Sequence, residues 1–273
     1  MKKFEGMLIC TDLDGTLLHK NKEVSKENLD AIEYFKSEGG LFTFITGRMP
    51  YCADEFYEMI HPNAPVGCIN GGGIYDYKTK KYLWTQELSP KALELVAYAE
   101  QNMTGLGVQI DTFDHIYFAF ENESTAWFRE VTGMPNLVRS YRDVHEPIAK
   151  IVFGDADTEN MLRLQELLKT HPFANEFDFI RSEKMLFEIL PKGINKGSLL
   201  PHFSEILGIS MDKTITVGDY NNDVEMLRAA RLGIAVANAT PEAKQAADYV
   251  TVSNTEHAIA KIIEELDTGT LKL

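Results

Sequence analysis

The first 83 residues alternate between short apolar runs and segments in which apolar residues recur every three or four positions. A continuous run such as MLIC is typical of a strand buried on both faces, and the second pattern predicts amphipathic helices. The predicted elements are a strand at 7–10, a helix capped by Ser25, a strand at 41–46, a helix at 50–60, a strand at 66–70 and a hairpin at 70–84. This β-α-β-α-β order predicts a parallel, doubly wound sheet.

The pattern changes in the middle of the chain, where predicted strands follow one another with only short turns between them. We expect helices at 90–101, 123–130 and 158–169, and strands near Val108 and Tyr117, at 148–154 and twice within 176–190. Strands joined by short turns indicate an antiparallel sheet, and we expect the helices to lie on one face of it. This part is therefore predicted to be a separate α+β unit.

Alternation of strands and helices resumes after Lys192. We expect a helix after 193–198, a strand at 214–217, a helix at 222–230, a strand at 232–237, a helix capped by Thr240 and a last helix from about 255. The simplest architecture is α/β, with a doubly wound, Rossmann-like core made from residues 1–84 and 190–273 and an α+β domain at 85–189 inserted into it. We expect a ligand to bind in a cleft between the two.

Composition narrows the classes of partner that the chain could bind. The formal net charge of −14 disfavours nucleic acid, because phosphate backbones are bound by clustered lysine and arginine side chains. No apolar run approaches the roughly 18 residues that span a bilayer, so we expect no membrane partner. Three cysteines without CxxC spacing predict reduced thiols in a cytoplasmic protein. A small phosphorylated metabolite still fits, provided that local cations, helix N-termini or a metal ion receive it.

Polar side chains follow several of the predicted strands. Four buried runs end in a polar residue, which is Asp12, Thr46, Asn70 or Asp219. In open α/β sheets, ligands bind beyond the carboxyl ends of the strands. We therefore expect these side chains to converge on one site.

Two acids, Asp12 and Asp14, lie one residue apart directly after the first apolar run. Side chains at i and i+2 of an extended chain point the same way, so the two carboxylates would form a hard oxygen site suited to Mg²⁺. Gly15 would then allow a sharp turn. A calcium-binding loop is excluded, because Thr16 and Leu17 stand where a ligand and a glycine are required. The alternative is an exposed turn with two solvated acids.

Two further segments carry groups suited to binding an anion. Thr46 and Gly47 offer a hydroxyl and an N–H group to phosphate oxygens, although a plain strand-to-helix turn would also explain them. Arg48 is either a candidate contact or a solvated residue at a helix start. Lys196 places a cation at a helix N-terminus, where it opposes the helix dipole unless an anion is shared there. The alternative for Lys196 is an ordinary surface lysine.

The segment VGDYNNDVEML supplies the last candidates. Asn222 and Asp223 begin the helix that follows, and a capping role would explain either of them. Capping does not explain Asp219, which lies at a strand end as Asp12 does. Asp219 is therefore a candidate for the same site.

Taken in order, these segments resemble the haloacid dehalogenase-like (HAD) superfamily, and specifically its Cof-type phosphatases. The matching motifs are DLDGTLL at 12–18, TGR at 46–48, NGG at 70–72, NKG at 195–197 and GDYNNDVEML at 218–227. The resemblance covers both ends of the chain, and the inserted middle corresponds to the large cap domain of that family, which sets substrate specificity. It implies an enzyme that hydrolyses small phosphomonoesters, such as sugar phosphates, with Mg²⁺ as cofactor.

The resemblance also implies a role for each acid. Asp12 would be the nucleophile that forms an aspartyl-phosphate, and Asp14 would protonate the leaving alkoxide and then deprotonate water. The Mg²⁺ would be held by Asp12, the Asp14 carbonyl and Asp219. Asp223 would orient Lys196 or a metal-bound water without binding the metal directly.

The remaining motif residues would bind the substrate. Phosphate oxygens would be held by the N–H groups of Leu13 and Gly47 and by the side chains of Thr46, Lys196 and Asn222. Arg48 would be a contact to the substrate.

Two other functions are compatible with the sequence. A phosphohexomutase has a similar core and cap, and it would need cap cations to hold a second phosphate. The other is a catalytically idle binding or regulatory protein on the same scaffold, because a fold does not determine a function. The sequence gives no indication of the oligomeric state.

Overall fold

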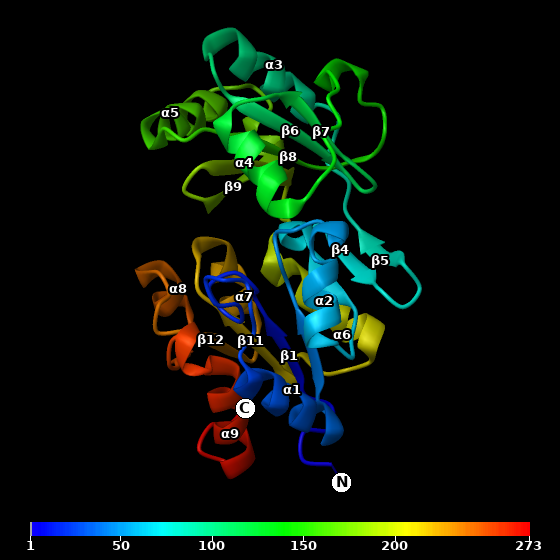
Figure 1. Cartoon of the computed structure of the whole chain (residues 1–273), viewed down its shortest axis with the longest axis vertical. Helices are drawn as coiled ribbons and strands as arrows, with labels where there is room; N and C mark the ends of the chain where they lie inside the picture. The colour runs from blue at the N-terminus through cyan, green and yellow to red at the C-terminus, as the bar shows by residue number, and fades with distance from the viewer. Residues whose placement is uncertain (1) are drawn as a thin grey trace. The chain divides into compact units, whose positions relative to one another are not determined.

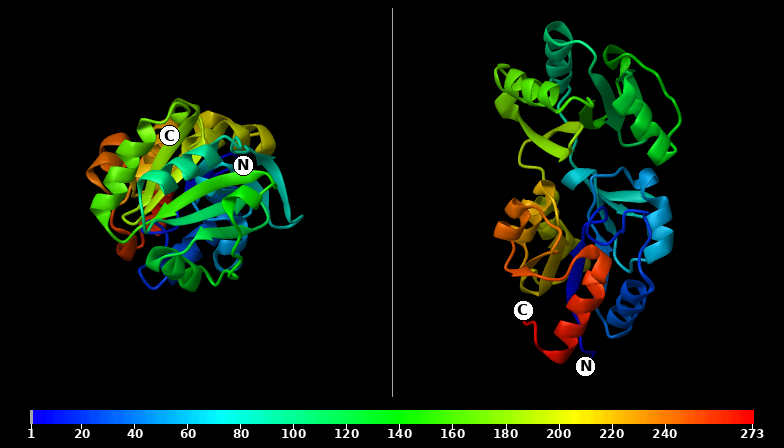
Figure 2. Two further views of the ribbon diagram at one scale, coloured as in Figure 1. Left: turned by 90° about the horizontal axis from the view of Figure 1, so that it is seen from above. Right: turned by 60° about the vertical axis from the view of Figure 1, so that its left-hand side comes forward.

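The computed structural model describes residues 2–273, and the chain divides into two compact units (Figures 1 and 2). Unit 1 is built from both ends of the chain, up to Trp84 and again over Asn195–Leu273. Unit 2 is the segment between them, Thr85–Ile194. Both chain ends therefore belong to unit 1, and each unit is described by itself.

The centre of unit 1 is a five-stranded parallel sheet with the strand order β13-β12-β11-β1-β2. Its strands are β1 (Leu8–Thr11), β2 (Leu41–Phe44), β11 (Thr214–Gly218), β12 (Leu232–Ala235) and β13 (Tyr249–Val250). The last residue of β1, Thr11, pairs with Phe44 on one side and Val217 on the other. The carboxyl ends of β1, β2 and β11 are consequently level with one another, which brings the residues after them to one edge of the sheet.

Helices cover both faces of this sheet (Figure 1). They are α1 (Lys26–Ser37), α2 (Asp54–Ile60), α6 (Leu199–Leu207), α7 (Val224–Ala229), α8 (Pro241–Ala246) and α9 (Ala258–Thr268). In β1, Ile9 packs into the cluster that contains α1 and α9, whereas Leu8 and Cys10 pack into the cluster that contains α6. The prediction that β1 is buried on both faces is confirmed.

Two predicted helix caps are confirmed, because the Ser25 hydroxyl accepts a hydrogen bond from the Asn28 N–H group and the Thr240 hydroxyl accepts one from Ala243. The predicted helix at 50–60 is shorter, since a 3₁₀ turn occupies Pro50–Cys52 before α2 begins at Asp54.

The third predicted strand does not belong to the parallel sheet, so that prediction was wrong. It forms a separate small sheet with the hairpin, in the order β3 (Val66–Cys68), β4 (Gly73–Asp76) and β5 (Lys81–Thr85). A single parallel bridge, Ile45 to Gly67, links β3 to the chain that follows β2. The cause is local: Ile69 and Asn70 have φ values of 60° and 50°, so the chain turns immediately after Cys68 and runs back antiparallel as β4.

Unit 2 is an antiparallel sheet with the strand order β7-β6-β8-β10-β9. Its strands are β6 (Gly107–Thr112), β7 (Ile116–Phe120), β8 (Ile148–Gly154), β9 (Phe177–Glu183) and β10 (Leu186–Pro191). Its helices are α3 (Ala92–Asn102), α4 (Glu123–Thr132) and α5 (Thr158–Lys169).

The helices of unit 2 do not all lie on one face of its sheet, contrary to the prediction. Helices α3 and α5 pack on the face that carries Ile110, Ile151 and Ile189, which we call the apolar face. Gly107 and Gly154 belong to the opposite face, and α4 begins against them. A Cβ on Gly107 would lie 2.5 Å from the Asn122 Oδ1 atom, so the missing side chain leaves room for this helix start. We call this second face the polar face.

Over residues 2–273, no helix combines the length and the apolar character that crossing a membrane requires. The three cysteines are free and buried.

Candidate active site

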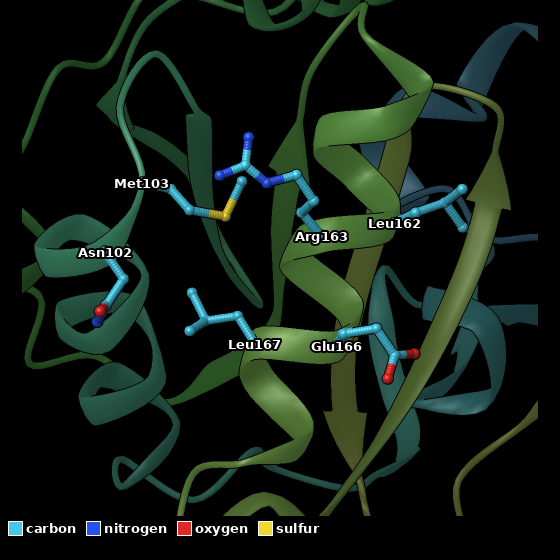
Figure 3. Close-up of a pocket in the computed structure, with 6 residues that line it drawn as sticks. All are labelled: Asn102, Met103, Leu162, Arg163, Glu166 and Leu167. Atoms are coloured by element: carbon cyan, nitrogen blue, oxygen red, sulfur yellow. The ribbon is translucent and has the colours of Figure 1, made fainter.

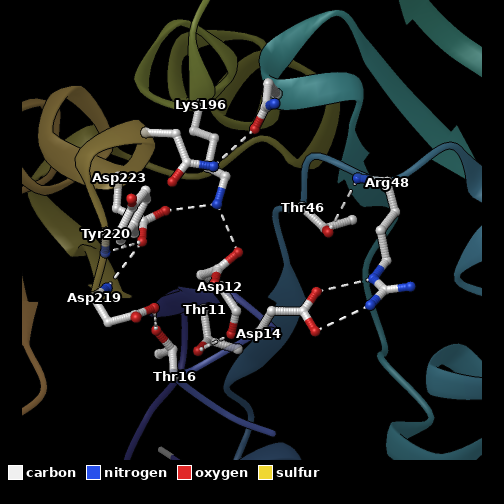
Figure 4. A network of polar contacts seen from close by, with 12 residues as sticks. Thr11, Asp12, Asp14, Thr16, Thr46, Arg48, Lys196, Asp219, Tyr220 and Asp223 are labelled. Carbon is white, nitrogen blue, oxygen red and sulfur yellow. Dashed lines mark hydrogen bonds and ion pairs between the residues drawn. The ribbon is translucent and has the colours of Figure 1, made fainter. Parts of the chain in front are cut away.

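All the sequence-predicted site residues belong to unit 1, and most of them follow one of its strands. Asp12 comes directly after β1, Asp219 directly after β11, and Thr46 two residues after β2. Lys196 begins the 3₁₀ turn that leads into α6, and Asp223 ends the turn that leads into α7. The structure brings their side chains into one polar network (Figure 4).

The centre of the network is the Lys196 ammonium group, which lies between two carboxylates (Figure 4). Its Nζ atom donates to the Asp12 Oδ1 atom and to the Asp223 Oδ1 atom, both at 2.6 Å. The exposed fractions are 1% for Lys196, 6% for Asp12 and 0% for Asp223. Burial by itself would lower the pKa of Lys196, but the two carboxylates outweigh it and the pKa is raised. The lysine is therefore a buried, charged residue and not a surface one.

Asp223 uses both of its carboxylate oxygens within the protein. Its Oδ1 atom accepts from Lys196, and its Oδ2 atom accepts from the N–H groups of Asp219 and Tyr220 at 2.9 and 3.0 Å. The side chain thus fixes both the lysine and the backbone of the turn after β11. This geometry favours an orienting role for Asp223.

Asp219 lies next to this pair and is held by a residue that the sequence reasoning did not single out. The Thr16 hydroxyl donates to the Asp219 Oδ1 atom at 2.7 Å. Burial and the nearby charge of Asp223 raise the pKa of Asp219 to about 7, against the opposing effects of Thr16 and Lys196. Burial likewise raises the pKa of Asp12 well above its ordinary value, although Lys196 opposes the shift.

These acids form a set that could hold a metal ion. One carboxylate oxygen from each of Asp12, Asp219 and Asp223 lies within 4.8 Å of the others. Three carboxylates facing a single ammonium group leave an excess of negative charge in a buried place, and burial together with that excess raises the pKa of Asp12 and Asp219. Hard oxygen donors with an unbalanced negative charge suit a divalent cation such as Mg²⁺. The donor set therefore fits the implied cofactor.

Asp14 does not point to the same place as Asp12, so that part of the prediction was wrong. Its carboxylate accepts from the Arg48 Nε and Nη2 atoms at 2.9 and 3.0 Å (Figure 4). It also accepts from the Lys22 Nζ atom at 2.5 Å. The rule for i and i+2 holds only for extended chain, and β1 already ends at Thr11. Burial tends to raise the pKa of Asp14, but the two cations more than offset it, and the pKa is lowered.

The turn after Asp14 requires glycine at position 15. Gly15 has φ +87°, in the region that side chains disfavour, and a Cβ there would lie 2.5 Å from the Asp219 Oδ2 atom. The sharp turn predicted from the sequence therefore also leaves the space that Asp219 occupies.

The predicted phosphate-binding segment adjoins a buried asparagine. The Thr46 Oγ1 atom accepts from the Arg48 N–H group at 3.2 Å, and a Cβ on Gly47 would lie 2.8 Å from the Asn70 Oδ1 atom. The Asn222 Nδ2 atom donates to that same Asn70 oxygen at 3.0 Å. Asn222 is therefore held against the turn after β3. Within residues 2–273, its side chain makes no capping hydrogen bond to the turn before α7 or to α7 itself.

Leu13 separates the two acids and contributes mainly through its backbone. Its side chain is buried in the core, and its carbonyl accepts from the N–H groups of Leu17 and Leu18 at 3.1 and 2.8 Å. These bonds fix the loop that carries Asp12 and Asp14.

Sequence reasoning assigned no role to Thr16 or Lys22, both of which the structure places beside the predicted acids, and it expected Asn70 at the site without giving it a role. Thr16 and Asn70 lie inside the quoted motifs DLDGTLL and NGG, so their positions were available as a signal. Lys22 lies outside every motif, and its contact with Asp14 depends on how the loop folds back.

A pocket of about 410 Å³ occurs elsewhere, in unit 2, between the end of α3 and α5 (Figure 3). It is lined by Asn102, Met103, Leu162, Arg163, Glu166 and Leu167. Arg163 and Glu166 are its only ionisable lining residues, so it offers no group of acids comparable with that around Lys196. We assign the reaction chemistry to unit 1.

Comparison with known proteins gives a consistent result. Residues 9–263 match the family of haloacid dehalogenase-like hydrolases. The chain is 27% identical over 289 residues to the 5-amino-6-(5-phospho-D-ribitylamino)uracil phosphatase YwtE of Bacillus subtilis, with 96% of this chain and 98% of that protein covered. It is 28% identical over 270 residues to the pyridoxal phosphate phosphatase YbhA of Escherichia coli, covering 94% and 97% of the two chains.

A solved structure shows the same fold. A haloacid dehalogenase-like hydrolase from Bacteroides thetaiotaomicron superposes with a TM-score of 0.83 and 25% identity, over 96% of this chain and 100% of that one. The predicted resemblance and the predicted α/β fold class are both confirmed.

Proposed function

Because the chain belongs to the haloacid dehalogenase-like hydrolases, we propose that it is a Mg²⁺-dependent phosphatase that hydrolyses small phosphomonoesters through an aspartyl-phosphate. The observation that carries the proposal is the buried Asp12, held at 2.6 Å by Lys196 beside Asp219 and Asp223. Relatives named as phosphatases of two small phosphorylated metabolites support this substrate class.

Asp12 would act as the nucleophile on the phosphoryl group. A carboxylate and a phosphate repel each other, so its charge must be compensated before they meet. Lys196 supplies one positive charge directly at the Asp12 Oδ1 atom, and Asp223 holds that lysine in place. The Mg²⁺ ion, held by Asp12, the Asp14 carbonyl and Asp219, would supply further positive charge to the phosphoryl oxygens.

The groups around Thr46 would hold the phosphate oxygens. The proposed donors are the Thr46 hydroxyl, the N–H groups of Leu13 and Gly47, and the Asn222 amide. Asn70 fixes Asn222 through its 3.0 Å hydrogen bond. The absence of a side chain on Gly47 leaves the space that the Asn70 amide occupies, so Gly47 supports this group of residues through Asn70.

Asp14 would move the protons. It would protonate the leaving alkoxide in the first step and accept a proton from water in the second. Arg48 and Lys22 stabilise its deprotonated form, which favours the acceptance of a proton in the second step and opposes the donation in the first, so Asp14 must be protonated when the substrate binds. Arg48 is thereby a partner of Asp14, in addition to its proposed contact with the substrate.

Unit 2 would act as the cap that selects the substrate. The core would comprise residues 1–84 and 190–273, and the cap would comprise residues 85–189. The partner would be a small phosphorylated metabolite in the cytoplasm. Neither nucleic acid nor a membrane is required by this chemistry.

The test is phosphate release from a panel of sugar, nucleotide and cofactor monophosphates, measured with Mg²⁺ and with EDTA. Asp12→Asn keeps the size of the side chain but removes the nucleophile, so we expect loss of Mg²⁺-dependent release. The exposed Asp212→Asn is the matched control and should retain activity. Release that persists in Asp12→Asn would refute the mechanism, and isomerisation of hexose phosphates that needs a bisphosphate activator would favour the mutase instead.

A further inference from the structure

The segment between β12 and α8 binds the backbone after two different strands of unit 1. It covers residues 236–240, and we call it the clamp segment. The Thr240 N–H group donates to the Asp219 carbonyl at 2.8 Å, directly after β11. The Asn238 Nδ2 atom donates to the Gly15 carbonyl at 2.8 Å, in the loop after β1. One short segment therefore contacts both of the loops that carry the candidate acids.

A second asparagine, Asn254, binds the same loop after β1 at a later position. Its Nδ2 atom donates to the Leu18 carbonyl at 2.9 Å, and its N–H group donates to the Asn238 Oδ1 atom at 2.9 Å. Asn254 is 8% exposed and Leu18 is 1% exposed, so losing this bond would leave a buried carbonyl without its donor. The two asparagines thus form one hydrogen-bonded chain that holds the loop at positions 15 and 18.

The bond to Gly15 also bears on Thr16, whose hydroxyl donates to the Asp219 Oδ1 atom at 2.7 Å. Gly15 and Thr16 share one planar peptide group, so fixing the Gly15 carbonyl fixes the direction in which the chain enters Thr16. The clamp segment therefore acts on Asp219 in two ways, through the Thr16 hydroxyl and through the Asp219 carbonyl.

The acids themselves oppose this arrangement. Carboxylate oxygens of Asp12 and Asp219, from the loops after β1 and β11, lie within 4.8 Å of each other. Like charges in a buried place repel, so these two loops would tend to move apart in the metal-free chain. Amide and backbone N–H groups oppose that movement without adding negative charge. Neutral donors are therefore suited to holding the two loops together.

We propose that Asn238 and Asn254 are positioning residues for the transfer of the phosphoryl group, because they hold the loop at 13–18 in place beside Asp219. This rests on the proposed phosphatase function. The two asparagines would act through the loop and not by contact with the substrate. Asp12, the proposed nucleophile, directly precedes the loop, and a displacement of about 1 Å at a reacting group can slow a reaction about 100-fold.

This role predicts that kcat and KM respond differently to loss of the asparagines. Among the groups proposed to hold the phosphate oxygens, only the Leu13 N–H group belongs to the loop at 13–18. The others come from elsewhere in unit 1, so binding of the substrate should depend little on the asparagines. Transfer to Asp12 should depend on them strongly.

The kinetic test measures hydrolysis of para-nitrophenyl phosphate with Mg²⁺ by the full chain. Asn238→Leu and Asn254→Leu each remove one donor and nearly keep the size of the side chain. Asn175→Leu is the matched control, because Asn175 is an exposed asparagine of unit 2. Urea unfolding of each variant identifies a temperature at which all of them are folded, and the assays are run there. Asn238 is exposed, so its variant keeps the test decisive if Asn254→Leu does not fold.

We expect Asn238→Leu and Asn254→Leu each to lower kcat about 10- to 100-fold while KM changes by less than about three-fold. Asn175→Leu should change neither. Thr16→Val removes the hydroxyl that holds Asp219, so its effect should not add to that of Asn238→Leu. The double variant should be little slower than the slower of the two single variants.

A second measurement depends on neither activity nor metal. The N–H groups of Leu17 and Leu18 both donate to the Leu13 carbonyl inside the loop. In EDTA, hydrogen exchange at these two groups should be faster in Asn238→Leu and Asn254→Leu than in wild type, and unchanged in Asn175→Leu. Equal exchange in all four proteins would show that the asparagines do not hold the loop.

Two kinetic results would overturn the inference while leaving the phosphatase intact. One is an unchanged kcat in folded Asn238→Leu, which would mean that the clamp segment serves stability alone. The other is additive losses in Asn238→Leu and Thr16→Val, which would mean that Asn238 does not act through Thr16. Failure of wild-type chain to hydrolyse para-nitrophenyl phosphate or any other monophosphate of the panel would instead refute the proposed function.

Discussion

Replacing Asp219 by asparagine should stabilise the metal-free protein, and increasingly so as the pH rises. The pKa of Asp219 is raised from 3.8 to about 7 in the folded chain. Between these values the folded protein keeps a proton that the unfolded chain has lost, so each increase in pH favours unfolding. Above pH 7 both states are ionised and the effect stays constant. Asparagine resembles the protonated acid and can still accept the Thr16 hydrogen bond.

The size of the effect follows from the shift in pKa. A difference of about three units at about 1.4 kcal/mol each corresponds to about 4 kcal/mol at high pH. Because Asp219 retains partial contact with solvent, about 2–4 kcal/mol is the expected range at pH 8.5. At pH 5 the pH lies only about one unit above the ordinary pKa of 3.8, which the side chain has in the unfolded chain. The stabilisation at pH 5 should therefore be less than half as large as at high pH.

Urea unfolding in EDTA, followed by far-ultraviolet circular dichroism at pH 5 and pH 8.5, measures the free energy of unfolding of wild type and Asp219→Asn. The exposed Asp212→Asn, measured in the same way, serves as the control for removing one acid from unit 1. The raised pKa of Asp219 would be refuted in two cases. In the first, Asp219→Asn is less stable than wild type at pH 8.5; in the second, its gain in the free energy of unfolding is the same at both pH values.

Three further predictions concern the same network. Lys196→Met leaves two buried carboxylates without their cation. The free energy of unfolding at pH 8, measured by urea titration, should therefore fall by about 3–5 kcal/mol. An unchanged value would contradict the buried ion pairs. Arg48→Met removes the bidentate partner that lowers the pKa of Asp14. The limb of the pH–rate profile that reports Asp14 should therefore move to higher pH. A limb at the same pH as in wild type would show that Asp14 does not titrate in catalysis. Gly47→Ala places a Cβ 2.8 Å from the Asn70 amide, so calorimetry should show a loss of about 1–3 kcal/mol, whereas a neutral result would mean that Asn70 moves freely.

Much of unit 1 could be predicted because its signals are local. The apolar run of β1 is long enough to define a strand and short enough to exclude a membrane helix, and the caps at Ser25 and Thr240 are adjacent to the helices that they begin. The error at β3 has an equally local cause, since its short apolar run contains no sign that Ile69 adopts a positive φ. A β-branched residue in that region is unusual, so sequence propensity argues against the turn that the fold imposes.

The sequence indicated which side chains would lie near one another, but it did not predict where all of them point. A strand order and a motif suffice to bring Asp12, Lys196 and Asp219 to one edge of the sheet. They do not determine where Asp14 points, because that depends on where β1 ends and on Arg48, which lies 34 positions away in the chain. The alignment of Gln109, Val152 and Glu188 across the unit 2 sheet depends in the same way on the register of three strands, which no single segment of sequence contains.

The two acids that looked alike in the sequence therefore lie in opposite electrostatic surroundings. Asp12 belongs to a group of three carboxylates with one ammonium, where negative charge is in excess and the pKa is raised. Asp14 belongs to a group with two cations, where positive charge is in excess and the pKa is lowered. A phosphate dianion is therefore repelled mainly by the negative charge around Asp12. A divalent cation would compensate that charge and would leave the surroundings of Asp14 unchanged.

We therefore expect the affinity for inorganic phosphate to rise when Mg²⁺ is added and to depend much less on Mg²⁺ in Asp219→Asn. Isothermal titration of phosphate with and without Mg²⁺ measures this coupling, and an equal affinity in both conditions would show that Lys196 alone compensates the charge of Asp12.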